Sequence, residues 1–304
     1  MVSIALIDRL RQEFGSAVLT GVDLSARTTF KIGGKARVLV EVSSAGMLKR
    51  VIGICNEHNT DVLCLGAGSN LLIADGGINS RVVISLNKLN HIKRKAGFRL
   101  LVGAGVRIAN LLAFCIEKGL GGLEWAGGLP ASVGGACYMN AGAFSGDMSK
   151  VVESVTILAD GKIRKVTGAK LFFNYRDSVF KSCLNCVIIE VLIRLSASTP
   201  KDVRERTANY INRRAQTQKV GLPSAGSVFK RMGEEVVPAR IIDSLGLKGM
   251  RVGGAEVSKV HAGYIVNAGN ATANDVLKLI KEIQKIVFGS LKLGLQTEII
   301  FWGD

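Results

Sequence analysis

A serine stands in a short glycine-containing stretch in the C-terminal third of the chain, Ser224-Ala-Gly-Ser-Val-Phe-Lys230. Ser227 follows Gly226 and precedes an apolar pair, a setting that suits either a nucleophile or a turn leading into a strand. The GxSxG elbow of hydrolases is absent, because Val228 and Phe229 follow the serine. The chain has only three histidines, none of them in a recognisable catalytic or metal motif. A Ser-His-Asp hydrolase is therefore disfavoured, and Ser227 requires a different chemistry.

A glycine-containing loop with side-chain donors follows a predicted strand in the first third of the chain. In Gly66-Ala-Gly-Ser-Asn70 the glycines let main-chain N–H groups approach a phosphate closely, and Ser69 and Asn70 add side-chain donors. The loop is not a Walker loop, because no Gly-Lys-Ser/Thr follows, and Leu72 breaks the third position of GxGxxG. An anion cradle and a tight structural turn fit this loop equally well.

The stretch Gly121–Gly142 combines many glycines with very little charge. This composition suits backbone packed closely against something flat or phosphorylated, which favours a cofactor wall over loops that cross the core without a ligand. The overlapping uncharged run 125–146 is long enough to cross a bilayer, but its six glycines, Pro130 and Asn140 suit loops and argue against a membrane span. Two glycine-rich loops in one domain indicate a dinucleotide cofactor.

The elements that must hold these loops follow an α/β pattern. Apolar periodicity and turn signals predict strands at 37–42, 61–65, 82–86, 98–102, 151–159, 162–167, 185–196 and 295–302, and helices at 44–58, 106–118 and 201–216. Asp160-Gly161 is a hairpin turn signal, and Thr272 with Asp275 resembles a capping box at the start of a last helix. The apolar stripe of that helix is Val276, Ile280, Ile283 and Val287. The length suits about two domains, and the small-residue linker 196–200 suggests a boundary near residue 197.

The charge balance is strongly basic in an otherwise ordinary globular composition. The chain has 48% hydrophobic residues and a formal net charge of +16, which fits a nucleic-acid partner, an anionic substrate or a basic proteome background. The densest basic cluster, His91–Lys95, lies between two predicted strands, and we interpret it as a solvated turn. With only 6% aromatic residues and no recognised binding motif, charge is the sole support for a nucleic-acid-binding protein.

The cysteines and the N-terminus both indicate a cytoplasmic protein. Six cysteines scattered among apolar neighbours favour reduced core thiols over a disulfide framework. Only Cys183-Leu-Asn-Cys186 has ligand spacing, and without a second pair we interpret it as two buried thiols rather than a zinc site. The first residues carry early charges, so no signal sequence is predicted.

Ordered blocks along the chain carry a family resemblance. The blocks are TTFKIGG (28–34), GAGSNLL (66–72), GLPASVGGACYMNAG (128–142), NYRDS (174–178), PSAGSVFK (223–230) and LQTE (295–298). Together they resemble the UDP-N-acetylenolpyruvoylglucosamine reductase family, in its shorter, second type. These flavin enzymes complete UDP-N-acetylmuramate synthesis in bacterial peptidoglycan assembly, and thereby serve cell-wall growth, cell shape and division. The resemblance runs from about Thr28 to Phe301.

The resemblance implies an α+β fold with a two-lobed FAD-binding domain of the vanillyl-alcohol-oxidase (PCMH) type and a C-terminal α/β substrate domain. Residues 1–27 form a helical lead-in, residues 28–197 the FAD-binding domain and residues 198–304 the substrate-binding domain. The two lobes cover about 28–86 and 87–197. The sequence linker falls at the same boundary.

The resemblance also assigns residues to the cofactor and the substrate. The cofactor is non-covalent FAD, and the implied FAD-binding residues are Gly66, Gly68, Ser69, Asn70, Pro130, Ser132, Gly134, Gly135 and Asn140. The implied substrate-binding residues are Tyr175, Arg214 and Lys230, with Arg214 neutralising the UDP diphosphate. No metal is expected. NADPH is the expected hydride donor, and the partner is a UDP-sugar, with no nucleic acid, no membrane and a monomeric state.

Three residues carry the implied catalysis. Arg176 and Glu298 act at the substrate carboxylate, where a guanidinium suits a developing enolate, and Ser227 supplies a proton. Taken singly, they also fit a surface ion pair, an exposed strand carboxylate and a turn hydroxyl. Another FAD-dependent oxidase or dehydrogenase on the same fold remains the main alternative function, and a basic nucleic-acid-binding protein is the other.

Overall fold

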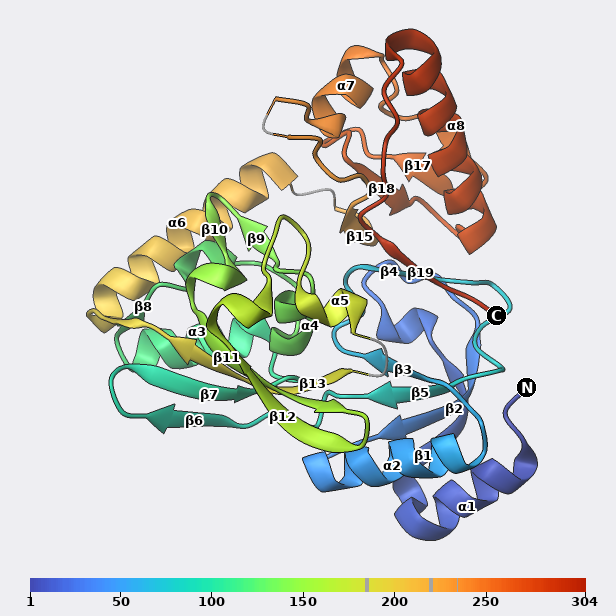
Figure 1. Ribbon diagram of the computed structural model, residues 1–304. Coiled ribbons are helices and arrows are strands. Elements are labelled where there is room, and N and C mark those ends of the chain that lie inside the picture. The colour runs from blue at the N-terminus through green and yellow to red at the C-terminus, as the bar shows by residue number, and fades with distance from the viewer. Residues whose placement is uncertain (184–185, 219–220, 234) are drawn as a thin grey trace. The chain divides into compact units, whose positions relative to one another are not determined.

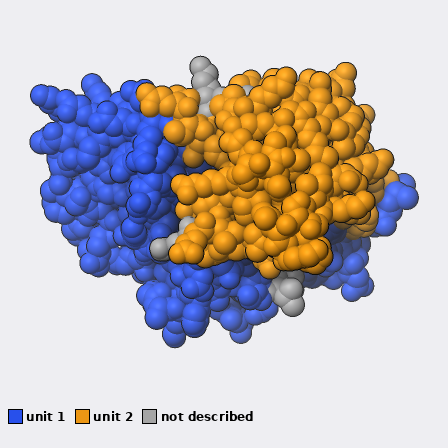
Figure 2. Space-filling view, turned by 90° about the horizontal axis from the view of Figure 1, so that it is seen from above, with its two compact units in different colours: residues 1–19, 38–67, 81–214 blue, residues 20–37, 68–80, 215–304 orange. Residues whose placement is uncertain are grey.

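The computed structural model describes residues 1–183, 186–218, 221–233 and 235–304. The chain forms two compact units (Figure 2). Unit 1 comprises residues 1–19, 38–67 and 81–214, and unit 2 comprises residues 20–37, 68–80 and 215–304. The predicted division into a FAD-binding and a substrate-binding domain concerns what each part binds, and it stays a prediction.

Helices and strands alternate along the chain, as the sequence predicted (Figure 1). Up to residue 121 they are α1 (Ile4–Phe14), β1 (Val18–Asp23), β2 (Lys35–Glu41), α2 (Ala45–Glu57), β3 (Val62–Leu65), β4 (Leu71–Ile73), β5 (Val82–Ser85), β6 (Ile92–Lys95), β7 (Arg99–Gly103), α3 (Ile108–Glu117) and β8 (Leu120–Gly121). Up to residue 218 they are α4 (Val133–Tyr138), β9 (Gly142–Ala143), β10 (Gly146–Asp147), β11 (Val152–Ala159), β12 (Lys162–Thr167), α5 (Val179–Ser182), β13 (Val187–Arg194), β14 (Ser196–Ala197) and α6 (Pro200–Gln218). The rest are β15 (Ser224–Ser227), α7 (Pro238–Ser244), β16 (Arg251–Val252), β17 (Ala255–Val257), β18 (Tyr264–Asn267), α8 (Ala273–Leu291) and β19 (Ile300–Trp302).

The first sheet has the strand order β1-β2-β5-β3, and β5 pairs in parallel with both β2 and β3. Helix α2 follows β2, as predicted, and begins where the Ser44 hydroxyl accepts a hydrogen bond from the Met47 N–H at 3.1 Å. Leu48, Val51 and Cys55 recur at helical spacing and are fully buried in the same core cluster as the strands. This core fixes the end of β3, from which the glycine loop departs.

The second sheet is antiparallel, in the order β12-β11-β13-β7-β6. The predicted hairpin is confirmed, because β11 and β12 are joined by Asp160 and Gly161 with φ of 49° and 69°, the left-handed pair that a tight hairpin requires. Helices α3 and α4 lie over one face of this sheet (Figure 1). The buried side chains of β7 and β13 point toward these helices, while their alternate residues are partly exposed.

The basic cluster is an edge strand, so its interpretation as a solvated turn is wrong. Residues Ile92–Lys95 form β6 and pair with β7, with Lys93 opposite Leu101 and Lys95 opposite Arg99. The short turn that connects the two strands begins only after Lys95. Lysines on an edge strand oppose pairing with another chain, which gives this part of the charge a structural explanation.

The glycine-rich stretch contains a helix that sequence reasoning missed. Residues predicted as loop include α4, which is only six residues long and whose N-cap, Ser132, accepts a hydrogen bond from Gly135 N–H at 3.3 Å. Its glycines lower helix propensity, so periodicity alone gave no signal. The capping serine was the available signal.

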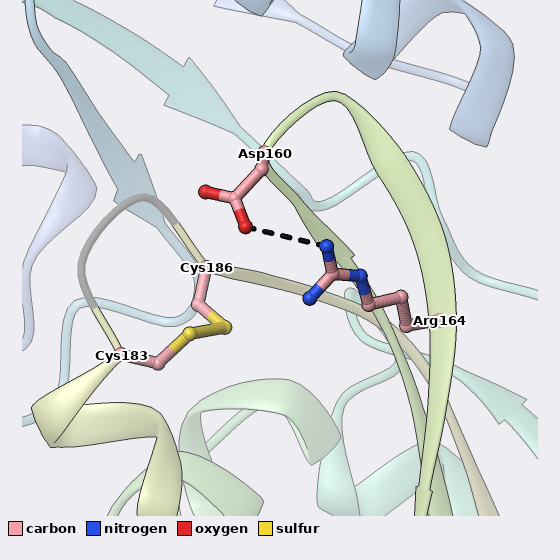
Figure 3. Close-up of a disulfide and its surroundings, with 4 residues drawn as sticks. All are labelled: Asp160, Arg164, Cys183 and Cys186. Carbon is pink, nitrogen blue, oxygen red and sulfur yellow. Dashed lines mark ion pairs between the residues drawn. A yellow bond between two sulfur atoms is a disulfide. The ribbon is translucent and has the colours of Figure 1, made fainter.

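Cys183 and Cys186 form a disulfide, so the prediction of two buried reduced thiols is wrong (Figure 3). Both residues are half-buried, and their Cα atoms lie 5.5 Å apart, within the normal range of disulfides. Cys55, Cys115 and Cys137 are buried free thiols, as predicted.

Unit 2 is built around the antiparallel sheet β15-β18-β17-β16, with α8 packed along it (Figure 1). The predicted capping box of α8 is confirmed: Thr272 Oγ1 accepts from Asp275 N–H at 3.0 Å, and Asp275 Oδ2 accepts from Thr272 N–H at 3.0 Å. The predicted apolar stripe of α8 is buried in the core of unit 2.

The terminal strand is shorter than predicted, because its two halves pair with different partners. Residues 300–302 form β19 in parallel with β4. The preceding segment pairs instead with the residues after β15, through an isolated bridge between Phe229 and Thr297. Among the described residues, no helix combines the length and apolarity that a bilayer crossing requires.

Candidate active site

The loop after β3 presents main-chain N–H groups in the manner of an anion nest. Its carbonyls are anchored: Arg107 Nη1 donates to Ala67 O at 3.5 Å, Thr29 N–H to Gly68 O at 3.2 Å and Ile300 N–H to Asn70 O at 2.9 Å. Within the described part of the chain, the N–H groups of Ala67, Gly68 and Ser69 meet no protein acceptor. Main-chain N–H groups of a glycine-containing loop that meet no protein acceptor fit a bound anion such as a diphosphate.

The two glycine-rich loops meet in unit 1 at Gly66 and Ser132. A Cβ added to Gly66 would lie 2.4 Å from Ser132 Oγ, so only glycine permits this approach. Ser132 is almost fully buried, and its hydroxyl caps α4. The two glycine-rich loops therefore lie side by side at this point, and a side chain at position 66 would fill the space between them. We call this space the cradle. This cradle and the unpaired N–H groups fit a flavin dinucleotide.

The remaining predicted cofactor residues differ in what they can reach. Pro130 and Gly135 are exposed, whereas Gly134 is buried, and a Cβ on it would lie 2.7 Å from that of Ala104. Asn140 is buried, and both ends of its amide have protein partners. Its Nδ2 donates to Asn174 O at 2.9 Å, and its Oδ1 accepts from the Ser149 N–H at 3.0 Å.

Arg176 lies in a tight turn between Asn174 and Asp177, which form a bridge. Its φ is 54°, in the left-handed region, where a non-glycine residue costs about 1–2 kcal/mol. Local bonds hold this turn: Arg176 Nη2 donates to Gly142 O at 3.0 Å, and Lys181 Nζ donates to Arg176 O at 2.6 Å. Backbone strain of this kind concentrates at functional sites.

The two predicted substrate residues of unit 1 have different surroundings. Tyr175 is exposed, and the Arg176 guanidinium lies 5.2 Å from its ring centre. Arg214, in the last part of α6, donates from Nε to Gly127 O at 3.0 Å, and its guanidinium lies 5.3 Å from the Phe144 ring centre. Arg214 therefore stabilises the glycine loop at 127 in addition to carrying a positive charge.

Ser227 is the last residue of β15, at a bulge. Ser224 pairs with Val266 and Ser227 with Tyr264, so four residues of β15 lie opposite three of β18. Gly226 takes up the extra residue with φ of 79°, a conformation that favours glycine. Ser227 is half-buried, whereas the next residue is fully buried. The tight glycine turn predicted at this stretch is thus a bulge within a strand.

Glu298 and Lys230 lie on the segments that follow and flank Ser227 in unit 2. Glu298 N–H donates to Val228 O at 2.7 Å, one residue after Ser227, and Lys230 N–H donates to Gln296 O at 2.8 Å. Asn70 joins the same group, because its Nδ2 donates to Glu298 O at 3.1 Å. The structure therefore gathers three predicted site residues of unit 2 around Ser227. Arg176, Tyr175 and Arg214 belong to unit 1.

Each histidine has a structural position, in agreement with the absence of a catalytic histidine motif. His58 caps the end of α2, and His91 Nε2 lies 3.1 Å from Glu190 Oε2. His261 Nδ1 accepts from the Gly263 N–H at 3.1 Å, and burial lowers the pKa of its imidazole. His261 is therefore a neutral turn acceptor at pH 7.

Sequence reasoning missed three residues that organise the site. Thr29 of the TTFKIGG block binds twice in unit 2, through its N–H to Gly68 O and through Oγ1 to Ser224 O at 2.7 Å. Arg107 braces Ala67, and Tyr264 lies directly opposite Ser227. The TTFKIGG block was the available signal for Thr29, whereas nothing local to Arg107 or Tyr264 predicted these pairings.

Comparison with known proteins first defines the class. A FAD-binding domain profile matches residues 36–167, and a profile of the UDP-N-acetylenolpyruvoylglucosamine reductase C-terminal domain matches residues 216–302. The protein is therefore a flavoprotein with an FAD-binding domain and a C-terminal domain, and the predicted α+β fold and FAD cofactor are confirmed.

The relatives define the family. The UDP-N-acetylenolpyruvoylglucosamine reductase of Thermotoga petrophila is 42% identical over 92% of this chain and 96% of its own length, and that of Clostridium novyi is 39% identical over 91% and 89%. The crystal structure of the Thermus caldophilus enzyme superposes with a TM-score of 0.79 at 34% identity, covering 93% of this chain and 98% of that one. The chain belongs to the UDP-N-acetylenolpyruvoylglucosamine reductase family.

Proposed function

We propose that the protein reduces UDP-N-acetylenolpyruvoylglucosamine to UDP-N-acetylmuramate, with NADPH as the electron donor, in peptidoglycan synthesis. The observation that carries the proposal is the 42% identity to a named reductase across 92% of the chain. The grouping of Ser227, Lys230, Glu298 and Asn70 in unit 2 supports it, because these are residues that the family assigns to the reaction. A UDP-sugar is thus the substrate.

The glycine loops hold the cofactor. The N–H groups of Ala67, Gly68 and Ser69 would bind the FAD diphosphate, with Asn70 beside them, and Pro130, Ser132, Gly134 and Gly135 would line the cofactor along the second loop. Asn140 supports this wall through its bonds to Asn174 and Ser149. When bound, FAD supplies the hydride that reduces the methylene carbon of the enolpyruvyl ether.

Ser227 gives a proton to the substrate carbon beside the carboxylate. Hydride addition leaves carbanion character there, and a strongly basic carbon held against a hydroxyl takes its proton without help from a histidine. The half-buried bulge position suits this role, because Gly226 directs Ser227 away from the buried side of β15. General acid catalysis of this kind contributes about 10²–10⁴-fold.

Arg176 and Glu298 act at the carboxylate end of the substrate. The guanidinium of Arg176 stabilises the developing enolate. The hydrogen bonds that hold the 174–177 turn fix the position of Arg176 before the substrate binds. Glu298 hydrogen-bonds at the same end from the segment beside Ser227. Tyr175, Arg214 and Lys230 bind the rest of the substrate, with Arg214 opposite the diphosphate.

The decisive experiment separates two half-reactions in anaerobic stopped flow. NADPH should reduce the yellow protein, and UDP-N-acetylenolpyruvoylglucosamine should then reoxidise it. Ser227→Ala should leave flavin reduction unchanged and slow reoxidation by about 10²–10⁴-fold. Two outcomes would contradict the proposal: the enolpyruvyl substrate fails to reoxidise the reduced flavin of the wild-type protein, or the protein turns over an alcohol instead. Turnover of an alcohol would favour the alternative of another flavin oxidase or dehydrogenase.

We also propose that the enzyme acts as a cytoplasmic monomer without a nucleic-acid partner. The basic edge strands support this, because part of the net charge serves to keep the sheet edges unpaired. Sedimentation at micromolar concentration tests the monomer. Salt-dependent DNA or RNA binding at physiological ionic strength would contradict the absence of a nucleic-acid partner.

A further inference from the structure

The Cys183–Cys186 disulfide stands at the end of the segment that carries Arg176. Cys183 directly follows α5, and Cys186 directly precedes β13. The adjoining β11–β12 hairpin carries an exposed ion pair, in which Arg164 Nη2 lies 3.4 Å from Asp160 Oδ2 (Figure 3). The pairing of Leu158 with Val187 confirms that this hairpin tip is beside Cys186.

The disulfide differs in accessibility from the free cysteines. Cys183 and Cys186 are half-buried, whereas Cys55, Cys115 and Cys137 are buried. Burial raises the pKa of the Cys55 and Cys115 thiols to about 12, so they hold almost no thiolate at pH 7. Burial likewise raises the pKa of Cys64 to about 12. Cys64 is half-buried like the disulfide pair, but it too holds almost no thiolate at pH 7, so the accessible sulfur chemistry of the described cysteines is that of the disulfide bond.

A short chain of contacts links the disulfide to Arg176. Lys181, two residues before Cys183, donates from Nζ to Arg176 O at 2.6 Å. At the start of α5, the buried Ser178 donates from Oγ to Tyr138 O at 2.7 Å. Helix α5 is thus anchored by Ser178 at its first end and by Phe180, which is buried in the core of unit 1, and the disulfide follows its last residue. Lys181 links this helix to the strained residue Arg176.

The loop that this disulfide closes is too short for a large effect on the unfolded chain. The two cysteines are only three residues apart, and the entropy that a cross-link removes from the unfolded state grows with the length of the closed loop. Disulfides of reducing compartments, moreover, are usually transient and redox-sensing. An effect of this bond is therefore expected on the adjoining end of α5 rather than on global stability.

We infer that Cys183–Cys186 is an exchangeable disulfide, reduced by dithiols, whose oxidation state sets how firmly α5 holds Arg176 for the substrate half-reaction. The inference rests on the proposed function. In the exchange, one thiolate of the dithiol attacks a disulfide sulfur and displaces the other as a thiolate, which takes a proton. The second reductant thiolate then displaces the first cysteine, so two protein thiols form and the reductant leaves as its disulfide.

Lys181 is a positioning residue in this arrangement, since it acts through the Arg176 carbonyl. Lys181→Met removes the donor and keeps the apolar stem, whereas Lys181→Arg keeps a donor. In oxidised protein, Lys181→Met should slow reoxidation of the flavin by the enolpyruvyl substrate about tenfold. The rate of flavin reduction by NADPH should change little. Lys181→Arg should recover most of the loss, which a merely structural role would not show.

The experiment compares oxidised holoenzyme with enzyme reduced by dithiothreitol and freed of it under argon. Thiol titration in denaturant should rise by two per chain on reduction. Reoxidation of the flavin by the enolpyruvyl substrate should slow by about 10- to 100-fold, and glutathione disulfide should restore both values. Flavin reduction by NADPH should be the same in both forms.

Two variants make the result specific. Cys183→Ser/Cys186→Ser should stay at the slow rate and ignore dithiothreitol, whereas Cys55→Ala, in α2, should respond like the wild type. Equal rates in the two wild-type forms, or a double variant that still responds to dithiothreitol, would overturn the inference. So would an unchanged thiol count.

The outcomes also separate this inference from the proposed function. Failure of the proposed function removes substrate-driven reoxidation in every form of the protein. Failure of the inference leaves that reaction in place and independent of the thiol count. Protease cleavage near α5 gives an activity-independent readout: it should be faster in the reduced and double-serine forms than in the oxidised one.

Discussion

Two short segments carry the proposed catalytic groups, and the protein holds them in different ways. Ser227 belongs to a strand whose main chain is paired on both sides, with β18 through the bulge and with residues 296–298 through Val228 and Lys230. Arg176 belongs to a turn that is closed by a single main-chain pair, Asn174 with Asp177, and that is tied to the rest of unit 1 by side chains. Chief among these are Lys181, which donates to the Arg176 carbonyl, and Asn140, which donates to the Asn174 carbonyl. Both segments contain a left-handed residue, but only the strand uses glycine for it.

The difference shows how each site responds to change. Main-chain pairing tolerates substitution of most side chains, because the hydrogen bonds remain. A turn held by side chains loses its position when one of them is replaced, and the left-handed arginine adds about 1–2 kcal/mol of strain that those contacts must offset. We therefore expect the Arg176 turn to be more sensitive to its neighbours and the Ser227 strand to be more sensitive to its backbone.

After Ser227→Ala, the largest effect should follow from Arg176→Lys. Lysine keeps the charge but loses the planar fork, so reoxidation by substrate should slow by about 10²–10³-fold while flavin reduction is unaffected. Stopped-flow traces of both half-reactions measure this. Arg164→Lys, at an exposed ion pair of the same unit, is the matched control and should behave as wild type. A tenfold loss in both variants would show a general effect of arginine replacement.

Gly226→Ala tests the strand through its backbone. An added Cβ meets no atom within 4 Å, so the cost is that of the left-handed conformation, about 1 kcal/mol of unfolding free energy. Any relaxation of the bulge redirects Ser227, and substrate-driven reoxidation should slow about tenfold. Gly161→Ala has the same conformational cost in the hairpin turn, again with no atom within 4 Å, and should leave both half-reactions intact. Equal rates of substrate-driven reoxidation in the two variants would show that the bulge does not position Ser227 for the reaction.

Gly66→Ala tests the cradle by close contact. The new methyl group would lie 2.4 Å from Ser132 Oγ, so we expect a loss of about 1–3 kcal/mol in stability and protein purified with little FAD. Ser132→Ala in the same chain removes that oxygen and leaves the Ser132 Cβ at 3.6 Å, an ordinary contact. Flavin absorbance per chain should therefore be higher in the double variant than in Gly66→Ala. No recovery would mean that the collision lies elsewhere.

The smallest effect should come from Asp275→Asn, in the capping box of α8. Hydrogen bonding to the Thr272 backbone lowers the pKa of the Asp275 carboxyl. The stabilisation is therefore complete above the ordinary aspartate pKa and is lost as pH falls through the folded value. Asp275→Asn should lower Tm at pH 7 by the equivalent of about 1 kcal/mol, with unchanged kinetics. The Tm difference from wild type should shrink below about pH 4, and a difference that persists at pH 2 would contradict this origin.

Much of the fold was predictable from local signals, and these are also the parts that need no distant partner. The apolar stripe and capping box of α8, the Ser44 start of α2 and the Asp160-Gly161 hairpin were all predicted and confirmed. The errors fall where local signals are weak or ambiguous. Helix α4 is rich in glycine, and β6 is a strand of basic residues that periodicity alone assigns to solvent.

The order and identity of the site residues were also present in the sequence, because each block is contiguous. Their mutual placement was not. The Glu298 N–H reaches Val228 O, and Thr29 Oγ1 reaches Ser224 O across 195 residues of chain. No local propensity specifies pairings of this separation, since they form only when distant parts of the chain fold together within unit 2.

By itself, the sequence determined the elements, the two glycine loops and a serine with no histidine to assist it. Only the tertiary structure decided that Ser227 sits on a bulge beside Glu298, that Arg176 is held in a left-handed turn, and that Cys183 and Cys186 close on one another. The physical reason is range: caps, turns and periodicity act within about one helical turn or one hairpin, whereas bulges, strained turns and cross-links depend on which surfaces the rest of the fold brings against them.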